Sequence, residues 1–329
     1  MALLALTLAL LAITVATMAY EEKPLDMALD SFDDQYQGCG PDMEAELPAL
    51  NHSEFQSNSL FAQVWPKAVA NWQIRGSPVS PLSSSAQAVA IMAYTMSDLY
   101  KEFNDNVRKA GRCPQTYQQN FHFKTLHFLL TDALAKLRDA QGKKCHCVIR
   151  GVKNYLFHAN VGDIVRFGQF ASSSICKNIA KFFGTTTVFE VHTCHGADIQ
   201  AFSRYPYEKE VLIPPYEKFI VTKVIPKGNN IHLDSIGTYS KYNCEWLTGG
   251  DNLGPWGHPL GPWGHPLGPW GQSGAMGTPM MRQRGNDTDW GWGTRTAACM
   301  VCGDKDTLCW GHQVWGQECA QWAWGQGHP

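Results

Sequence analysis

The chain has no excess of positive charge, because 27 Lys and Arg residues face 29 Asp and Glu residues, giving a formal net charge of −2. This balance argues against the basic surface typical of proteins that bind nucleic acid or anionic membranes. No G-x-G-x-x-G motif follows a predicted strand, so a dinucleotide would not be held in the Rossmann manner. No second long apolar run follows the N-terminal one. A lipid anchor that needs a hydrophobic C-terminal tail is therefore not expected, and neither is a stable membrane anchor.

The N-terminus carries the one long apolar run, MALLALTLALLAITVATMAY. It ends in small residues, with Thr17 and Ala19 suited to a cleavage site, and two glutamates follow it. The pattern predicts a signal peptide over 1–19 and secretion to the extracellular space; retention in the ER lumen is the alternative. A transmembrane anchor is disfavoured by the threonines in the run and by the lack of a flanking Lys/Arg cluster.

Cysteine content agrees with the secretory route. The chain has 11 cysteines, a number typical of proteins from oxidising compartments, where disulfides persist. Asn51-His52-Ser53 is an N-glycosylation sequon, which is useful only on that route. We therefore predict a disulfide-bonded glycoprotein.

Composition changes sharply near residue 247. Residues 248–329 hold 18 of the 30 glycines and 9 of the 12 tryptophans, and from Leu253 they repeat the unit LGPWGHP. Repeated Gly-Pro breaks helix and sheet, so this tail is predicted to be low-complexity and disordered. A zinc site is the alternative; its ligands would be Cys299, Cys302, Cys309 and Cys319, with His312. The cysteine spacings match no familiar zinc module well.

The remaining part, 20–247, is predicted to be one α+β domain with N-terminal helices followed by strands. Apolar residues recur at steps of three and four over 89–103 and over 123–137, and a shorter helix is expected over 55–74. After Gly142 short β-rich runs follow one another, separated by Gly, Pro and Asn. Helices first and strands later indicate a mainly antiparallel sheet rather than a doubly wound fold.

Glu208 and Glu210 stand one residue apart in YPYEKEVLIPPYEKF, at the start of a β-rich run. In a strand both side chains would lie on one face, roughly 6.5 to 7 Å apart along the chain. Paired carboxylates stabilise the oxocarbenium-like state in which a bond to an anomeric carbon breaks. The bland alternative is a solvated strand end. An inverting glycoside hydrolase fits poorly, because its two carboxylates must flank opposite faces of a sugar.

Two further elements precede this pair: Arg150 in CVIRGV, and the serines of RFGQFASSS, which begin at Ser172. In this order, Arg, Ser-x-Ser and Glu-x-Glu, they resemble the vertebrate ecto-mono-ADP-ribosyltransferases that modify arginine. LDMALDSFDDQYQGC, FHFKTLHFLLTDALAKL and the closing YNCEWL also look like segments of that family. The resemblance covers about residues 22–246 and implies an NAD–protein-arginine mono-ADP-ribosyltransferase with the fold of that family.

The resemblance also implies a role for each catalytic position. Arg150 would contact the NAD diphosphate, and Ser172 would orient the ribose and the catalytic glutamate. Glu210 would hold the ribose 2′-hydroxyl and stabilise the oxocarbenium as nicotinamide leaves. Glu208 would hold the incoming guanidinium and take its proton, because a guanidinium with a pKa above 12 is a poor nucleophile.

Further positions of the NAD pocket carry over less securely. They are Tyr94, Gly151, Gln169, Phe183 and Ser203, with Phe182 competing for the place of Phe183. The substrate would be NAD or NADP, with no metal and no prosthetic group. The acceptors would be protein arginines or small guanidino compounds, and no nucleic-acid partner is implied.

Disulfide pairing is implied in the same way, as Cys39–Cys244 and Cys145–Cys194. Cys147 is close enough in sequence to compete for Cys194, and the partners of Cys113, Cys147 and Cys176 stay open.

Two functions other than arginine transfer also stay open. One is an NAD glycohydrolase on the same fold, in which water replaces arginine. The other is a secreted binding module without catalysis, which would be expected to have lost one of the Arg, Ser or Glu positions.

Overall fold

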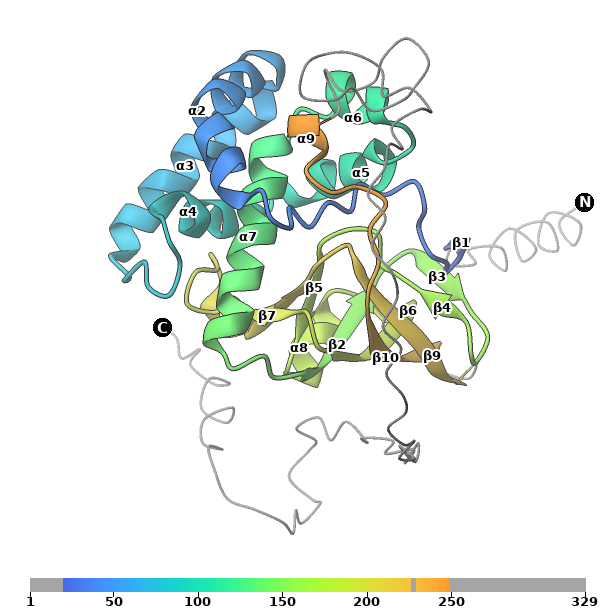
Figure 1. Ribbon diagram of the computed structural model, residues 1–329. Coiled ribbons are helices and arrows are strands. Elements are labelled where there is room, and N and C mark those ends of the chain that lie inside the picture. Colours follow the sequence, from blue (N-terminus) through green and yellow to red (C-terminus); the bar gives the residue numbers. More distant parts are fainter. Residues whose placement is uncertain (1–19, 226–228, 249–329) are drawn as a thin grey trace, which may run out of the picture.

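Helices α2 to α7 precede the strands of the main sheet along the chain, as predicted, and they form a layer separate from that sheet (Figure 1). The computed structural model describes residues 20–225 and 229–248. The predicted signal peptide, and the predicted tail beyond Thr248 with its cysteines, lie outside the described residues. No helix among those described is long and apolar enough to cross a membrane.

The helical layer contains α2 (Gly40–Ser57), α3 (Ser59–Arg75), α4 (Ser85–Tyr94), α5 (Tyr100–Ala110), α6 (Pro114–Asn120) and α7 (Lys124–Ala140). The periodicity over 89–103 predicted one helix, and this was wrong: α4 and α5 are separated by a turn. The Thr95 hydroxyl donates to the carbonyl oxygens of Ile91 and Met92 at the end of α4. The apolar stripe continues across the break because both helices face the same core.

The helix predicted over 55–74 is present as α3, but it begins at Ser59, four residues later than predicted. The chain forms α2 and α3 there, and Asn58 ends the first helix and begins the second. The Asn58 side chain accepts a hydrogen bond from the backbone N–H of Phe61 at 3.0 Å, which caps α3.

The main sheet has eight strands in the order β4-β9-β10-β6-β2-β5-β8-β7. Their bounds are β2 (His146–Val152), β4 (Ile164–Val165), β5 (Ala171–Ser174), β6 (Thr187–Thr193), β7 (Ala197–Asp198), β8 (Glu210–Ile213), β9 (Glu217–Ile225) and β10 (Asn230–Thr238). All pairs are antiparallel except β10 with β6, so the prediction of a mainly antiparallel sheet is confirmed. Strand β1 (Glu21–Pro24), which the sequence did not suggest, pairs in parallel with β3 (Tyr155–His158) in a small second sheet.

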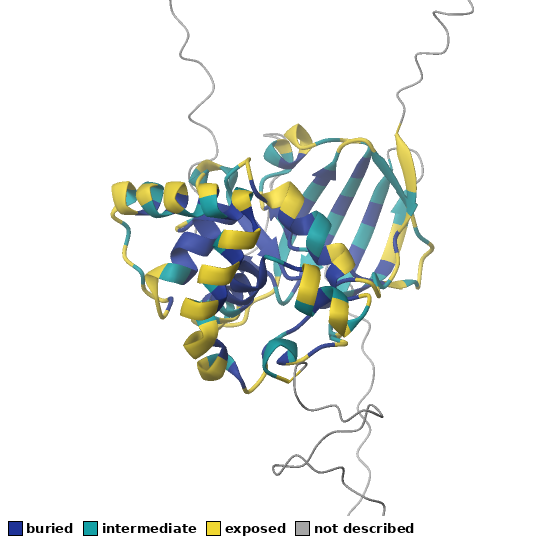
Figure 2. Cartoon of the chain, turned by 90° about the horizontal axis from the view of Figure 1, so that it is seen from above, coloured by how far each residue is buried: buried dark blue, intermediate teal, exposed yellow. Residues whose placement is uncertain are grey.

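Alternating burial along the central strands fixes which side chains face the core. In β6 every second residue from Thr187 to Thr193 is buried and those between are half-buried, and Figure 2 shows these stripes along the sheet. One apolar cluster joins the helices to sheet residues such as Ala197 and Leu212 and to Phe170, which precedes β5. A second cluster, which includes Val148, Phe189 and Phe219, is formed mainly by the strands.

Both disulfides implied by the resemblance are present, Cys39–Cys244 and Cys145–Cys194. The first joins residues 205 apart in sequence, and constraint of so long a loop in the unfolded chain contributes about 5 kcal/mol. It ties the segment before α9 (Glu245–Thr248) to the start of α2. The thiol of Cys113 is free.

Asp33 and Asp34 attach the closing segment to the rest of the domain. Asp33 is fully buried and pairs with the buried guanidinium of Arg166 at 2.6 Å, and it also accepts the backbone N–H of Lys241. Asp34 accepts the backbone N–H groups of Cys244 and Glu245. Through these two aspartates the segment LDSFDDQYQGC, near the start of the domain, binds the segment that closes the domain.

Asp33→Asn is expected to lower the free energy of unfolding by about 3 to 5 kcal/mol, because it leaves the charge of Arg166 buried and unpaired. Urea denaturation measures this change. The matched control is Asp30→Asn, which removes an exposed carboxylate paired with Arg112 and should change stability by less than about 1 kcal/mol. Equal effects of the two substitutions would contradict the assignment.

Candidate active site

Three neighbouring strands, β2, β5 and β8, bring the Arg, Ser and Glu positions together. β5 pairs with both β2 and β8, and within these pairs Ser174 stands opposite Glu210 while Ser172 stands opposite Leu212. Arg150 on β2 donates a hydrogen bond to the carbonyl oxygen of Ser172 at 2.6 Å. Residues 60 positions apart in sequence thus meet at one place on the sheet.

Arg150 is only partly exposed, and its guanidinium lies 5.9 Å from the centre of the Phe167 ring. Burial lowers the pKa of Arg150, and the nearby charge of Glu210 opposes that shift. A guanidinium so placed keeps its charge and donates in a fixed, planar geometry suited to phosphate oxygens.

Glu210 is the first residue of β8 and is only 5 % exposed. The pKa of Glu210 is raised to about 7, chiefly by burial and also by the charge of Glu208, while hydrogen bonds from Ser172 and Ser203 and the charge of Arg150 oppose the rise. A carboxylate in this setting is poorly solvated and strongly stabilises a positive charge that forms beside it.

Glu208 does not lie in the strand, so the prediction that both glutamates share one strand face was wrong. It ends the short 3₁₀ helix η1 (Pro206–Glu208), and Lys209 then adopts a left-handed conformation with φ of 47°. Pro206 at the start of this helix favours the turn over an extended strand. Only at Glu210 does the strand begin, yet the turn still brings the charge of Glu208 close enough to act on Glu210.

The serine run fixes the backbone of this turn. The Ser174 hydroxyl donates to the carbonyl oxygen of Glu208 at 2.7 Å, and the Ser173 hydroxyl donates to that of Val211 at 2.7 Å. The Glu208 carboxylate has no ion pair with any described residue and remains partly exposed. The backbone of Glu208 is held while its side chain is available to a ligand.

Residues 25–241 match the model of the family NAD:arginine ADP-ribosyltransferase. The chain belongs to this family. It is 49% identical over 232 residues to the erythroblast NAD(P)(+)--arginine ADP-ribosyltransferase of Gallus gallus, covering 69% of this chain and 77% of the relative. It is 47% identical over 241 residues to the GPI-linked NAD(P)(+)--arginine ADP-ribosyltransferase 1 of Mus musculus, covering 69% and 74%.

Solved structures show the same fold. The crystal structure of the eucaryotic mono-ADP-ribosyltransferase ART2.2 is 36% identical in sequence, with a TM-score of 0.60 over 67% of this chain and 98% of that chain. A mutant of ART2.2 solved in complex with NAD gives a TM-score of 0.57 at 35% identity and the same coverage. The predicted ADP-ribosyltransferase fold is thereby confirmed.

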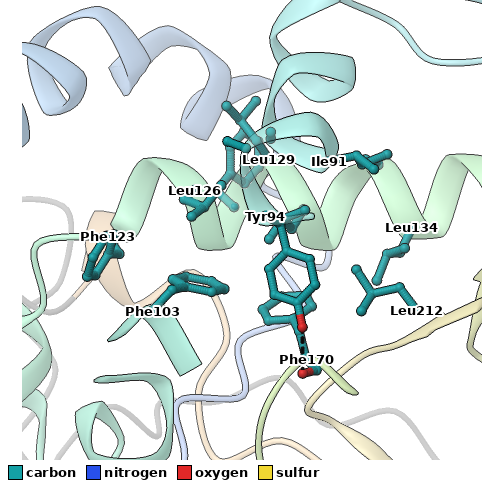
Figure 3. Close-up of a cluster of buried hydrophobic side chains, with 14 of the residues drawn as sticks. Ile91, Tyr94, Phe103, Phe123, Leu126, Leu129, Leu134, Phe170 and Leu212 are labelled. Atoms are coloured by element: carbon teal, nitrogen blue, oxygen red, sulfur yellow. Dashed lines mark hydrogen bonds between the residues drawn. The ribbon is translucent and has the colours of Figure 1, made fainter. Parts of the chain in front are cut away.

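Tyr94, at the end of α4, links this ADP-ribosyltransferase site to the helical core (Figure 3). Its ring is buried, and its hydroxyl donates to the carbonyl oxygen of Phe170 at 2.9 Å and lies 3.4 Å from the Ser172 hydroxyl. Burial raises the pKa of Tyr94 to about 12, so the hydroxyl stays protonated. Asn104, a buried side chain on α5 that was not predicted as a site residue, donates to the Tyr94 hydroxyl and to the carbonyl oxygen of Phe170. Its place among the apolar residues of α5 is consistent with burial, but its hydrogen-bond partners lie on other segments.

The other predicted pocket residues lie on the loops around these strands. Ser203 is buried and accepts the backbone N–H of Tyr205, whereas the Gln169 side chain accepts from Arg108. Phe182 and Phe183, at the end of α8 (Lys177–Phe182), are 89 % and 53 % exposed, so neither packs in the core.

Close packing of the backbone explains why a glycine stands at position 151. A Cβ at this position would lie 2.3 Å from the carbonyl oxygens of Ala180 and Gly184, so only glycine lets α8 and the following turn approach β2. Gly151 thereby lets the end of α8, which carries both phenylalanines, pack against β2, the strand of Arg150.

Two other predictions concern metal and glycan. Among the described residues, Cys145, His192 and Cys194 are the one group whose ligand atoms cluster, within 4.8 Å. The two sulfurs are bonded to each other, so only the imidazole remains as a ligand, and the group does not make a metal site.

Asn51 lies within α2, where its side-chain oxygen is buried without a hydrogen-bond partner among the described residues. Its glycosylation stays a prediction.

The pKa of Glu210 predicts a pH dependence of NAD cleavage. Below about pH 7 this carboxyl is protonated and cannot stabilise positive charge, so kcat/KM for NAD should rise with pH up to about 7 and level off above it. Nicotinamide release measured from pH 5 to 9 tests this. Because Glu208 helps to raise the pKa, the midpoint should move to lower pH in Glu208→Gln. A flat profile, or a midpoint that does not move, would contradict the arrangement.

Proposed function

We propose that this protein transfers ADP-ribose from NAD to arginine side chains of proteins and releases nicotinamide. The observation that carries the proposal is the buried carboxylate of Glu210, set beside Ser172, Ser203 and Arg150 in a chain of the arginine ADP-ribosyltransferase family. NADP is expected to serve as well, since relatives are named for both dinucleotides.

In the proposed reaction the diphosphate lies against Arg150 and the nicotinamide ribose against Ser172 and Glu210. The bond from the anomeric carbon to the nicotinamide nitrogen breaks, and nicotinamide leaves with the electron pair. Glu210 stabilises the oxocarbenium that remains. A guanidinium nitrogen then bonds to the anomeric carbon and gives a proton to Glu208.

The remaining positions would complete the pocket. Tyr94 and Ser203 hold Ser172 and Glu210 in place, and Gln169, Gly151 and Phe183 line the approach of the dinucleotide. The exposed ring of Phe183, at the end of the helix that packs against β2, suits a face that stacks on nicotinamide. Hydrolysis is expected as a side reaction wherever water reaches the oxocarbenium.

We also infer that the protein acts outside the cell. The predicted signal peptide and the two disulfides support this, and similar proteins are named as ecto or GPI-linked enzymes. Because some relatives are GPI-linked, the expectation that this protein has no membrane anchor stays a prediction.

The test uses the full chain, produced through an oxidising secretory route, with NAD and agmatine as a small guanidino acceptor. Nicotinamide and ADP-ribosyl-agmatine are measured together. Both products in similar amounts are expected. Nicotinamide without adduct would replace the proposal with an NAD glycohydrolase, and no NAD turnover by a folded sample would replace it with a binding module.

A further inference from the structure

Two arginines, Arg75 and Arg204, lie at the segment that leads into the Glu208 turn. Arg75, the last residue of α3, donates to the carbonyl oxygen of Ser203, whose hydroxyl contacts Glu210. Arg204 is the next residue along the chain. Its backbone N–H donates to the Thr95 hydroxyl at 2.8 Å, and its side chain is exposed. Segments far apart in sequence thus place two guanidiniums at the edge of the site.

Aromatic contacts lead from Arg204 to the acceptor glutamate. The Arg204 guanidinium lies 5.7 Å from the centre of the Tyr205 ring. That ring meets the Tyr207 ring edge to face, with 5.9 Å between centres, and Tyr207 directly precedes Glu208. The Tyr207 ring is 68 % exposed, so a protein bound over it would reach both Arg204 and Glu208.

Neither arginine is neutralised. Among the described residues, no carboxylate lies within ion-pair distance of Arg75 or Arg204, although several exposed arginines and lysines elsewhere have such partners. Burial lowers the pKa of Arg75, and the charge of Arg204 lowers it further, so the two cations act on each other. Two like charges held together without a counterion favour an anionic ligand.

The NAD diphosphate is a poor candidate for that anion. Burial lowers the pKa of Arg150 most, and the cation that also lowers it is Arg108 on α5. The additional positive charge near the proposed diphosphate site therefore comes from Arg108 rather than from Arg75 or Arg204. Arg75 and Arg204 border the Glu208 turn, where the acceptor arginine is proposed to enter. An anionic group of the acceptor is therefore the better candidate for the ligand of the two arginines.

We propose that Arg75 and Arg204 bind a carboxylate of the acceptor protein, so that arginines with an Asp or Glu nearby are modified preferentially. This rests on the proposed function. The target arginine would then lie against the negative charge of Glu208, and the neighbouring acidic residue of the acceptor would lie against the positive charges of Arg75 and Arg204. Such a contact contributes to specificity and association more than to the chemical step.

The experiment compares three acceptors with the full chain and NAD. Two are peptides of Gly, Ala and Ser with one arginine, which differ by Glu or Gln two residues away, and the third is agmatine. The Glu peptide is expected to have a kcat/KM about three to ten times that of the Gln peptide, and the ratio should fall toward one at 0.5 M salt. Arg204→Gln should remove the preference without changing agmatine transfer, and Arg204→Glu should reverse it. Arg112→Gln, at an exposed arginine that pairs with Asp30, is the matched control and should retain it.

Three outcomes would overturn the inference while leaving the transferase activity established. The first is equal use of both peptides by a protein that modifies agmatine. The second is a preference that persists in Arg204→Gln. The third is an effect of Arg204→Gln that is not specific to the acceptor. If agmatine transfer fell as much as transfer to the Glu peptide, the arginine would serve the fold. If only the KM for NADP relative to NAD changed, the arginine would serve dinucleotide binding. Failure of agmatine transfer in the unchanged protein would instead count against the proposed function.

Discussion

Glu210→Gln should lower both nicotinamide release and arginine transfer by about 1,000-fold, because both reactions pass through the same oxocarbenium. Glutamine has nearly the same shape and keeps hydrogen-bonding capacity toward Ser172 and Ser203. It carries no charge, however, and the site of Glu210 is so buried that a charge there has a large effect. The measurement is turnover of NAD with and without agmatine, under saturating NAD.

Stability separates this effect from misfolding. The raised pKa of Glu210 means that folding becomes less favourable as pH rises from the ordinary glutamate pKa of 4.5 through about 7, where the buried group must ionise. At pH 8 Glu210→Gln removes that charge, so the variant should unfold at the same or a higher temperature than the unchanged protein. Nicotinamide release within tenfold of normal by the folded variant would contradict the role of Glu210.

The fold brings Arg150, Ser172 and Glu210 close together, as the resemblance leads one to expect, and their catalytic roles stay predictions. The local structure around Glu208 was not predicted. The strand geometry assumed for Glu208 failed because alternation along a strand holds only where every residue is extended, and Lys209 is left-handed. The left-handed residue is a lysine rather than a glycine, so composition offered no warning.

Other features depend on contacts between distant segments, and these have no local signal. Asn104 is recognisable as a site residue only once α5 is known to face Phe170. Asp33 and Asp34 look like ordinary surface acids in sequence, yet they bind the closing segment more than 200 residues away. The helix boundary at Thr95 was missed for a related reason, since the apolar stripe continues from α4 into α5.

Glu208→Gln is expected to separate the two halves of the reaction. Transfer to agmatine should fall by at least about 100-fold, the usual contribution of a positioned general base. Nicotinamide release should stay within about tenfold of normal, because the residues proposed to hold NAD are untouched. The structure supports this division: the Glu208 backbone is fixed by Ser174, while its carboxylate is not used in any ion pair of the described residues.

The ratio of ADP-ribosyl-agmatine to nicotinamide measures the effect directly, and Glu208→Asp is the matched control. Aspartate keeps the charge but is one methylene shorter, so it should retain part of the transfer while glutamine retains almost none. If Glu208→Gln lowered both products equally, this glutamate would be needed for NAD cleavage itself. If it lowered neither, another base would have to take the guanidinium proton. A selective loss of the adduct would mean that the turn before β8, rather than the strand, decides whether arginine or water receives ADP-ribose.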